Sequence, residues 1–465
     1  MKFDKLYFLN CILFLTCLGC GLYAVSGDVL FGDNPLKPMP TYGIFILMGC
    51  FFMSLIAMLV INVKKNHYRP SRILLIAFAF ILLMNIITTK TLPNGLVFNV
   101  AFGEGLHDSY VVNISLLSRF IYILQFLIVL SITFLMIDVI PKISHGHDSA
   151  RWGAYFGLIV IFVVMIIGYF MEYESYIKFF TVNIQEYAYK YPVQSLLPNK
   201  NSYAVVLLSA LVACLYLHQR KFRWYWLVAA TFIYLNILFT VSKTTIAAST
   251  FLIIGYFIYR FILSIKKHPV RNSITLASFL LVIGGFVWTL CYLDNKQGDI
   301  FSSFISFMRI GADFWTFSSR TILWDKVIQI LNQTNWLTGV GFHVFNVILD
   351  GFKSTGTSFS HNGALELLGN GGIILLAFVV LIIAYLLYLL VKETKKHLSF
   401  TIFEYLIIAA MIVECIAESG NFILPSTIDY FFVSFIVIVP IMERKATIES
   451  KLLFEKTISF PLQNL

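Results

Sequence analysis

The chain has 465 residues, of which 59% are hydrophobic and only 12% are charged. A soluble globular domain carries about 25% charged residues, so this composition excludes a water-soluble enzyme with a large hydrophobic core. The net charge of +10 comes from Lys and Arg in short clusters between apolar runs, which indicates membrane topology rather than nucleic-acid binding. The seven cysteines lie in or beside apolar segments, and we predict neither a disulfide framework nor a metal site.

Apolar runs long enough to cross roughly 30 Å of hydrocarbon predict twelve transmembrane helices. The first run follows a short basic N-terminus without a small-residue cleavage site, so we interpret it as a retained span rather than a signal peptide. The predicted spans are residues 6–25, 42–63, 73–89, 116–140, 153–171, 202–217, 224–239, 245–263, 274–293, 372–391, 400–416 and 428–441. The predicted fold class is an all-α, polytopic helical membrane protein.

Basic residues test this count, because twelve spans place alternate loops on the same side. The side that holds both termini carries 22 of the 34 Lys and Arg residues, all in short segments. By the positive-inside rule both termini are cytoplasmic, and we expect a cytoplasmic-membrane protein. The predicted organisation is helices 1–9 in residues 1–293, an extracytoplasmic loop in 294–361, helices 10–12 in 362–442 and a cytoplasmic tail in 443–465.

The long loop between helices 9 and 10 contains a second helical pattern, near residues 319–331. Leu323, Val327 and Ile330 recur at helical spacing, together with Trp324 and Leu331. We predict an amphipathic helix that lies at the membrane interface, capped by Ser318 or Ser319, with Arg320 in its first turn.

Three polar segments stand at ends of spans or on this helix, all on the predicted outer face. They contain Lys243, Arg320 and the pair His361-Asn362. Each has a plain alternative: Lys243 snorkels to headgroups, Arg320 is a surface residue, and His361 packs at the interface. No phosphate loop, GxSxG, HExxH or DxD pair is present, which argues against a soluble nucleotide-sugar donor.

Taken together, these segments resemble the O-antigen ligase and Wzy-type polysaccharide polymerase superfamily over residues 198–390. Lys243 stands where that superfamily usually has Arg, which loses bidentate recognition but keeps a cation. The residues that carry the resemblance are Asn199, Asn201, Ser242-Lys243-Thr244, Arg320, Trp324, Gly339-Val340-Gly341, His361-Asn362, Leu365 and Gly372.

The resemblance implies a GT-C-like, inverting, metal-independent glycosyltransferase without a cofactor, which uses a polyprenyl diphosphate-linked oligosaccharide on the outer leaflet. His361 would be the base for an acceptor hydroxyl, and Arg320 with Lys243 would hold the diphosphate. Membrane lipids and other polysaccharide assembly proteins are the expected partners, and nucleic acid is not. The implied substrate-binding residues are Lys243, Ser242, Asn362, Trp324 and Asn201.

Three functions remain open at this point. A polymerase of capsule, exopolysaccharide or O-antigen repeat units is the leading prediction, and a ligase that transfers glycan to lipid A core or protein uses the same chemistry. A secondary transporter or lipid flippase is the third, supported by Glu414 and Glu418 one turn apart on the eleventh span. Glu418 could equally bind a sugar or pair with an outer cation, so it joins the candidate substrate-binding residues.

Overall fold

The computed structural model describes twelve stretches of the chain and residue 270. Three predicted features lie outside these residues. They are the ninth span, the part of the long loop before residue 320, and the two serines predicted to cap the amphipathic helix. The described residues are 5–30, 41–65, 68–102, 106–144, 148–182, 184–197, 199–221, 223–265, 270, 320–352, 359–418, 420–425 and 428–459.

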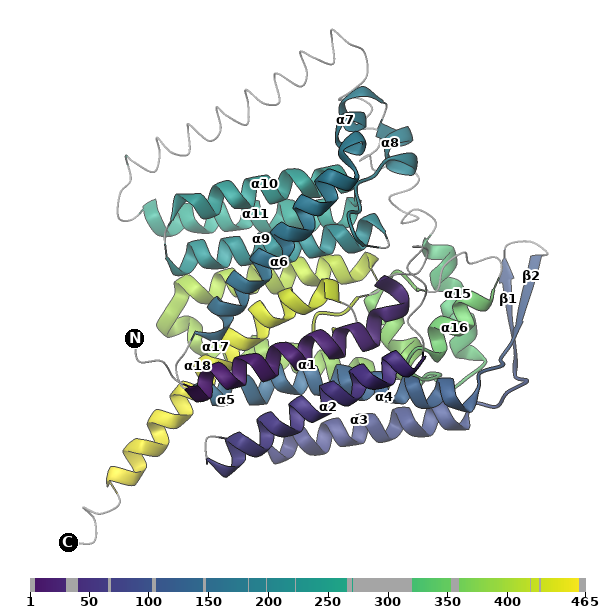
Figure 1. The fold of residues 1–465 in the computed structure, drawn as a ribbon, viewed down its shortest axis with the longest axis horizontal. Coiled ribbons are helices and arrows are strands. Elements are labelled where there is room, and N and C mark those ends of the chain that lie inside the picture. Colours follow the sequence, from purple (N-terminus) through teal and green to yellow (C-terminus); the bar gives the residue numbers. More distant parts are fainter. Residues whose placement is uncertain are drawn as a thin grey trace. The chain divides into compact units, whose positions relative to one another are not determined.

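Within these residues the protein is predominantly helical, and eight helices are long and apolar enough to cross a membrane (Figure 1). A membrane-spanning helix satisfies its own backbone hydrogen bonds, which lipid cannot do. The eight candidate spans are Lys5–Val25, Tyr42–Lys64, Arg72–Thr91, Leu116–Ile143, Ser149–Met171, Lys200–Arg220, Lys243–Ile262 and Gly363–Glu393. They confirm a polytopic helical membrane protein, while the count of twelve stays a prediction.

Three other predicted spans are helical but are not among these eight. The seventh is α10 (Trp224–Thr240), which has 17 residues. The eleventh lies within the 55-residue helix α17 (Gly363–Ala417), and the twelfth lies at the start of α18 (Ile428–Ser459).

The chain divides into two compact units, one of which contains residues 1–156, 322–389 and 418–465. Its helices are α1 (Lys5–Leu30), α2 (Thr41–Lys64), α3 (Arg72–Thr91), α4 (Leu116–Phe134), the π-helical segment η1 (Leu135–Val139), α5 (Ile140–Ile143), the start of α6 (Ser149–Met171), most of α15 (Arg320–Asn332), α16 (Val344–Gly351), the first part of α17, and α18.

Cys17 and Cys20, spaced as Cys-x-x-Cys within α1, are both free thiols.

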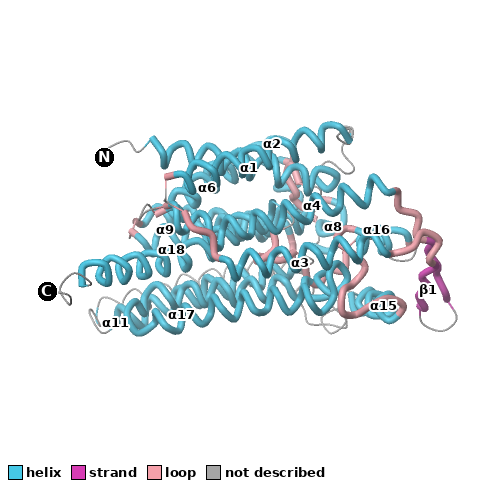
Figure 2. The backbone as a smooth tube through the Cα atoms, turned by 90° about the horizontal axis from the view of Figure 1, so that it is seen from below, coloured by secondary structure: helices cyan, strands magenta, loops and turns pink. Residues whose placement is uncertain are grey.

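A β-hairpin interrupts the helices of this unit, which the all-α prediction did not include. Strands β1 (Val97–Phe102) and β2 (Leu106–Val111) pair antiparallel, with Val97 opposite Val111. Figure 2 shows the strands in magenta. The open edge of β1 is covered by two side-chain amides, Gln329 in α15 and Gln333 directly after that helix. Gln333 accepts from the Asn99 N–H at 2.9 Å and donates to its carbonyl at 2.6 Å, and Gln329 does the same at Ala101. The two glutamines thus act as a substitute third strand.

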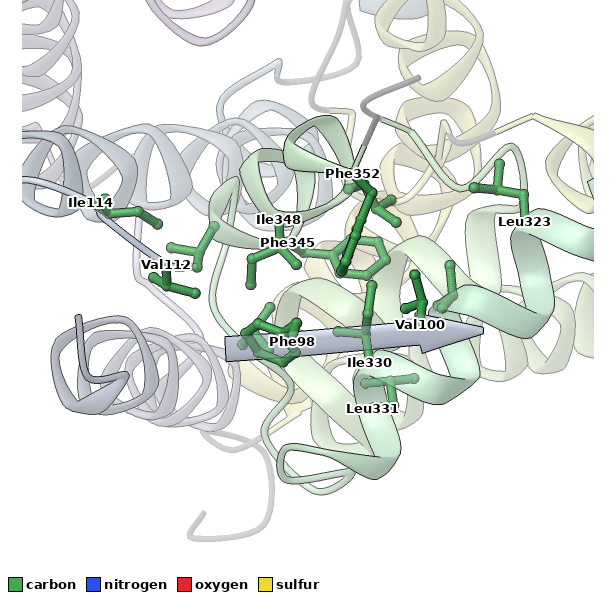
Figure 3. Close-up of a cluster of buried hydrophobic side chains, with 14 residues drawn as sticks. Phe98, Val100, Val112, Ile114, Leu323, Ile330, Leu331, Phe345, Ile348 and Phe352 are labelled. Atoms are coloured by element: carbon green, nitrogen blue, oxygen red, sulfur yellow. The ribbon is translucent and has the colours of Figure 1, made fainter. Parts of the chain in front are cut away.

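The hairpin, α15 and α16 share one hydrophobic core (Figure 3). Phe98 and Val100 from β1 pack with Val327 and Ile330 from α15, and all four side chains are at most 1% exposed. The amphipathic helix predicted near 319–331 is therefore present, but its apolar face is buried by protein. The prediction that this face lies on the membrane is wrong, because the sequence pattern does not reveal which apolar partner covers it.

Arg119, near the start of α4, ties that helix to the C-terminal end of α3. Its Nη1 donates to the carbonyls of Thr89 and Leu92 at 2.7 and 2.6 Å, and its Nη2 donates to Asn94 Oδ1 at 2.7 Å. A helix leaves its last carbonyls without internal partners, so this buried guanidinium acts as a C-cap supplied by another helix.

The other unit contains residues 157–321 and 390–417. After the rest of α6 come α7 (Tyr173–Thr181), α8 (Ile184–Lys190), α9 (Lys200–Arg220), α10, α11 (Lys243–Ile265) and the last part of α17. Side chains from Tyr203 to Gln219 are buried all around α9, as expected for a helix that is covered by protein on every face. Asn199 caps α9, since its Oδ1 accepts from the Ser202 N–H at 2.8 Å.

Candidate functional site

The pair His361-Asn362 directly precedes α17, as the sequence predicts. Asn362 Oδ1 accepts from the N–H groups of Ala364 and Leu365, both at 3.0 Å, so this side chain caps the helix. His361 has a φ of +49°, a left-handed conformation that side chains other than glycine rarely adopt. Such a conformation persists only where the surroundings enforce it, and it is frequent at functional sites.

His361 faces a carboxylate from a distant part of the same unit. Its Nδ1 lies 3.5 Å from Glu418 Oε2, and the two side chains are 29% and 10% exposed. Helix α17 ends at Ala417, so Glu418 lies past the helix and not one turn after Glu414 on its face, which corrects the prediction. A carboxylate beside Nδ1 orients the imidazole and favours the tautomer that carries its proton on Nδ1.

Glu366, in the first turn of α17, is the hub of a hydrogen-bond network that the sequence prediction missed. Its Oε2 accepts from the N–H and hydroxyl of Ser360 at 3.0 and 2.7 Å. Its Oε1 accepts from the side-chain amides of Asn346 and Asn370 at 2.5 and 3.3 Å. Glu366 is 8% exposed and Ser360 is fully buried. An acidic residue in the first turn of a long apolar helix is the signal that could have found it.

Trp324 contacts Ser360 at its backbone carbonyl, whereas Glu366 contacts its N–H and hydroxyl groups. The indole N–H of Trp324 donates to the Ser360 carbonyl at 3.1 Å. This contact joins α15 to the segment that carries His361. Arg320 is the first residue of α15, one helical turn before Trp324.

The glycines of the sequence motif interlock two backbone segments. Gly339 and Gly372 both have positive φ, +64° and +65°. A Cβ on Gly339 would lie 2.5 Å from the Gly369 carbonyl, and one on Gly372 would lie 2.4 Å from that of Leu337. Val340 N–H donates to the Gly369 carbonyl at 2.9 Å, and Ile373 N–H donates to that of Trp336 at 2.9 Å. This close docking fixes the N-terminal part of α17, at whose end His361 stands.

His343, the other histidine near this segment, is held in the structure in a different way. It has a φ of +57°, precedes α16, and its backbone N–H donates to Asn370 Oδ1 at 3.0 Å. Burial lowers the pKa of the imidazole to about 4. Its ring packs against Tyr122 and Phe342. These contacts favour a packing role.

The remaining candidates lie in the other unit. Ser242 Oγ is 3.1 Å from Thr245 Oγ1, which donates to Glu414 Oε1 at 2.8 Å. Lys243 is the first residue of α11, and Asn201 lies in the first turn of α9. Lys200, the first residue of α9, donates to the Ala188 carbonyl at 2.9 Å and is close enough to Lys243 for the two charges to repel. Sequence reasoning missed Thr245, Lys200 and the bonded role of Glu414.

The structure therefore brings four of the predicted residues together in the first unit. His361 faces Glu418, and Trp324 and Asn362 both contact the adjacent Ser360. In the other unit it joins Ser242 to Thr245 and Glu414, and it places Lys243 and Asn201 at the starts of helices. Among the described residues, no group of three or more His, Cys, Asp or Glu side chains could hold a metal ion. In comparisons with known proteins, no family model and no curated protein matches this chain.

Proposed function

We propose that this protein is a membrane glycosyltransferase that polymerises polysaccharide repeat units. It would transfer glycan from a polyprenyl diphosphate carrier to an acceptor sugar hydroxyl, on the outer face of the cytoplasmic membrane. The proposal combines the resemblance of residues 198–390 to lipid-linked glycan polymerases with one observation, the pairing of His361 with Glu418.

The pair supplies what a general base requires. A neutral imidazole accepts a proton at Nε2 when a carboxylate holds Nδ1–H, and the carboxylate then stabilises the imidazolium that forms. The separation of 3.5 Å is longer than a hydrogen bond of about 2.7–3.2 Å, and such contacts commonly shorten when substrate binds. At 29% exposure the histidine side chain remains reachable.

In the proposed reaction, the acceptor hydroxyl attacks the anomeric carbon of the donor sugar as its proton passes to His361 Nε2. The new glycosidic C–O bond forms while the bond from that carbon to the diphosphate oxygen breaks, with inversion. Polyprenyl diphosphate leaves with the bonding electrons. Arg320 and Lys243 are proposed to hold the negative charge that develops on it.

A ligase that passes finished glycan to lipid A core or protein differs only in its acceptor. A strain that lacks the gene separates the two functions through the glycans that accumulate. A polymerase deficiency leaves glycolipid with a single repeat unit. A ligase deficiency leaves long polymer on the lipid carrier, and that result would contradict the polymerase proposal.

The same strain tests the base when it is complemented with variants. We expect His361→Ala to leave single-repeat glycolipid at normal protein abundance. His107→Ala is the matched control, because His107 is an exposed histidine in β2, and it should restore wild-type polymer. Long polymer in the His361→Ala strain would refute the proposal.

A further inference from the structure

We infer that Glu366 is a positioning residue, which holds His361 in its left-handed conformation opposite Glu418 by fixing the Ser360 peptide. The inference rests on the proposed function, since it assigns Glu366 a task in the same reaction. Nothing in the sequence motif required this residue.

The geometry at Ser360 carries the first step. Its N–H donates to Glu366 Oε2 at 3.0 Å, while its carbonyl accepts from Trp324 Nε1 at 3.1 Å. Its hydroxyl lies 2.7 Å from Glu366 Oε2 and 2.9 Å from the Asn362 carbonyl. The two peptide groups that flank Ser360 are therefore held in place. The second of them supplies the backbone nitrogen of His361, so its orientation helps to set the φ of +49°.

The second step is that Glu366 itself cannot turn away. Its other oxygen accepts from Asn346 Nδ2 at 2.5 Å and from Asn370 Nδ2 at 3.3 Å, so protein donors surround both oxygens. Asn370 comes from the next turn of α17 and also accepts from the His343 N–H. A carboxylate can accept at both oxygens, whereas a glutamine amide presents two donor hydrogens on one side. A glutamine at this position would therefore point its NH2 group either at the Ser360 donors or at the amide donors of the two asparagines, and would lose the hydrogen bonds on that side.

The third step concerns the consequence for His361. A left-handed residue other than glycine relaxes to an ordinary conformation when its surroundings allow it. Relaxation of His361 would rotate the ring away from Glu418, which belongs to another segment and does not follow. A displacement of about 1 Å at a reacting group can cost roughly 100-fold in rate. Glu366 contributes to turnover in this way without contacting the sugar or the diphosphate.

The test measures kcat and the KM for purified lipid-linked repeat units in Glu366→Gln. We expect kcat to fall about 10-fold to 100-fold while KM for the donor changes less than about twofold. A role in folding alone would reduce the amount of active protein and leave kcat per folded molecule unchanged, so the folded fraction is measured by size-exclusion chromatography. Ser360→Ala, which removes the hydroxyl contact but keeps the N–H contact, should lose less than Glu366→Gln. It also serves as the second variant if Glu366→Gln does not fold, and then an unchanged kcat in Ser360→Ala contradicts the inference.

A double-mutant cycle distinguishes positioning from an independent effect. If Glu366 acts through the His361–Glu418 pair, Glu366→Gln combined with Glu418→Gln should lose little more than the worse single variant. Losses that multiply would contradict the inference. The two proposals also fail separately. Full activity in His361→Ala removes the proposed function, whereas an inactive His361→Ala beside an unimpaired Glu366→Gln removes only the role of Glu366.

Discussion

Replacement of Glu418 by glutamine probes the electrostatic part of the proposed base. The substitution keeps the size of the side chain and removes its charge, which lies 3.5 Å from His361 Nδ1. If proton transfer makes His361 cationic in the transition state, the lost energy is the attraction between imidazolium and carboxylate. Coulomb's law at this separation gives about 1.2 kcal/mol at a dielectric constant near 80 and about 4.7 kcal/mol near 20.

Partial exposure of the pair places its effective dielectric constant between these limits. A barrier increase of about 1 to 5 kcal/mol corresponds to a fall in kcat of roughly 5-fold to 5,000-fold. The assay is single-turnover transfer between purified lipid-linked repeat units in detergent, so that product release does not hide the chemical step. Glu174→Gln is the matched control, because Glu174 is an exposed carboxylate on α7. A wild-type single-turnover rate in Glu418→Gln would show that the charge of Glu418 does not assist His361.

Four further predictions follow from other parts of the chain. Arg320→Lys should lose about 10-fold to 100-fold in activity, because a guanidinium makes two parallel hydrogen bonds to phosphate and a lysine does not. Lys243→Arg should keep its activity. Equal activity of Arg320→Lys and wild type would contradict the diphosphate-binding role of Arg320. Arg119→Ala should destabilise the protein by about 3–5 kcal/mol, because it leaves the buried carbonyls at the end of α3 without hydrogen-bond partners. The loss is measured as a lower Tm in detergent. An unchanged Tm would contradict the capping role of Arg119. Gly372→Ala should reduce the yield of folded protein, because its Cβ would lie 2.4 Å from the Leu337 carbonyl, whereas Gly49→Ala has open space and should not. Burial lowers the pKa of His343 to about 4, so below pH 6.5 the unfolded chain binds a proton at this residue that the folded chain does not bind. The free energy of unfolding should therefore fall by up to about 3 kcal/mol from pH 6.5 to pH 4. His343→Gln should remove that part of the pH dependence of Tm.

Sequence alone predicted those elements whose signal is local. Long apolar runs predicted the spans, and the helical spacing of Leu323, Val327 and Ile330 predicted α15. The pair His361-Asn362 was placed at the start of a helix, where Asn362 acts as its cap. Each of these depends only on composition or on residues within a few positions of one another.

What the sequence missed depends on contacts between distant segments. The hairpin is two strands of six residues whose open edge is covered by Gln329 and Gln333, more than 200 positions away. The membrane-facing assignment of α15 failed because an apolar face looks the same whether lipid or protein covers it. Glu366 joins residues 346, 360 and 370 only after the glycine-rich loop docks on α17, so no spacing rule reveals the network.

In the proposed reaction, His361 accepts the proton of an acceptor sugar during transfer from a polyprenyl diphosphate. The most direct measurement is the release of polyprenyl diphosphate, followed together with the appearance of a two-repeat glycolipid, from purified protein and a single-repeat lipid-linked donor. We expect stoichiometric formation of both products by wild type and by His107→Ala, and a loss of at least about 100-fold in His361→Ala with donor binding retained. Transfer by His361→Ala at the wild-type rate, or the absence of any transfer by wild type, would contradict the proposed reaction.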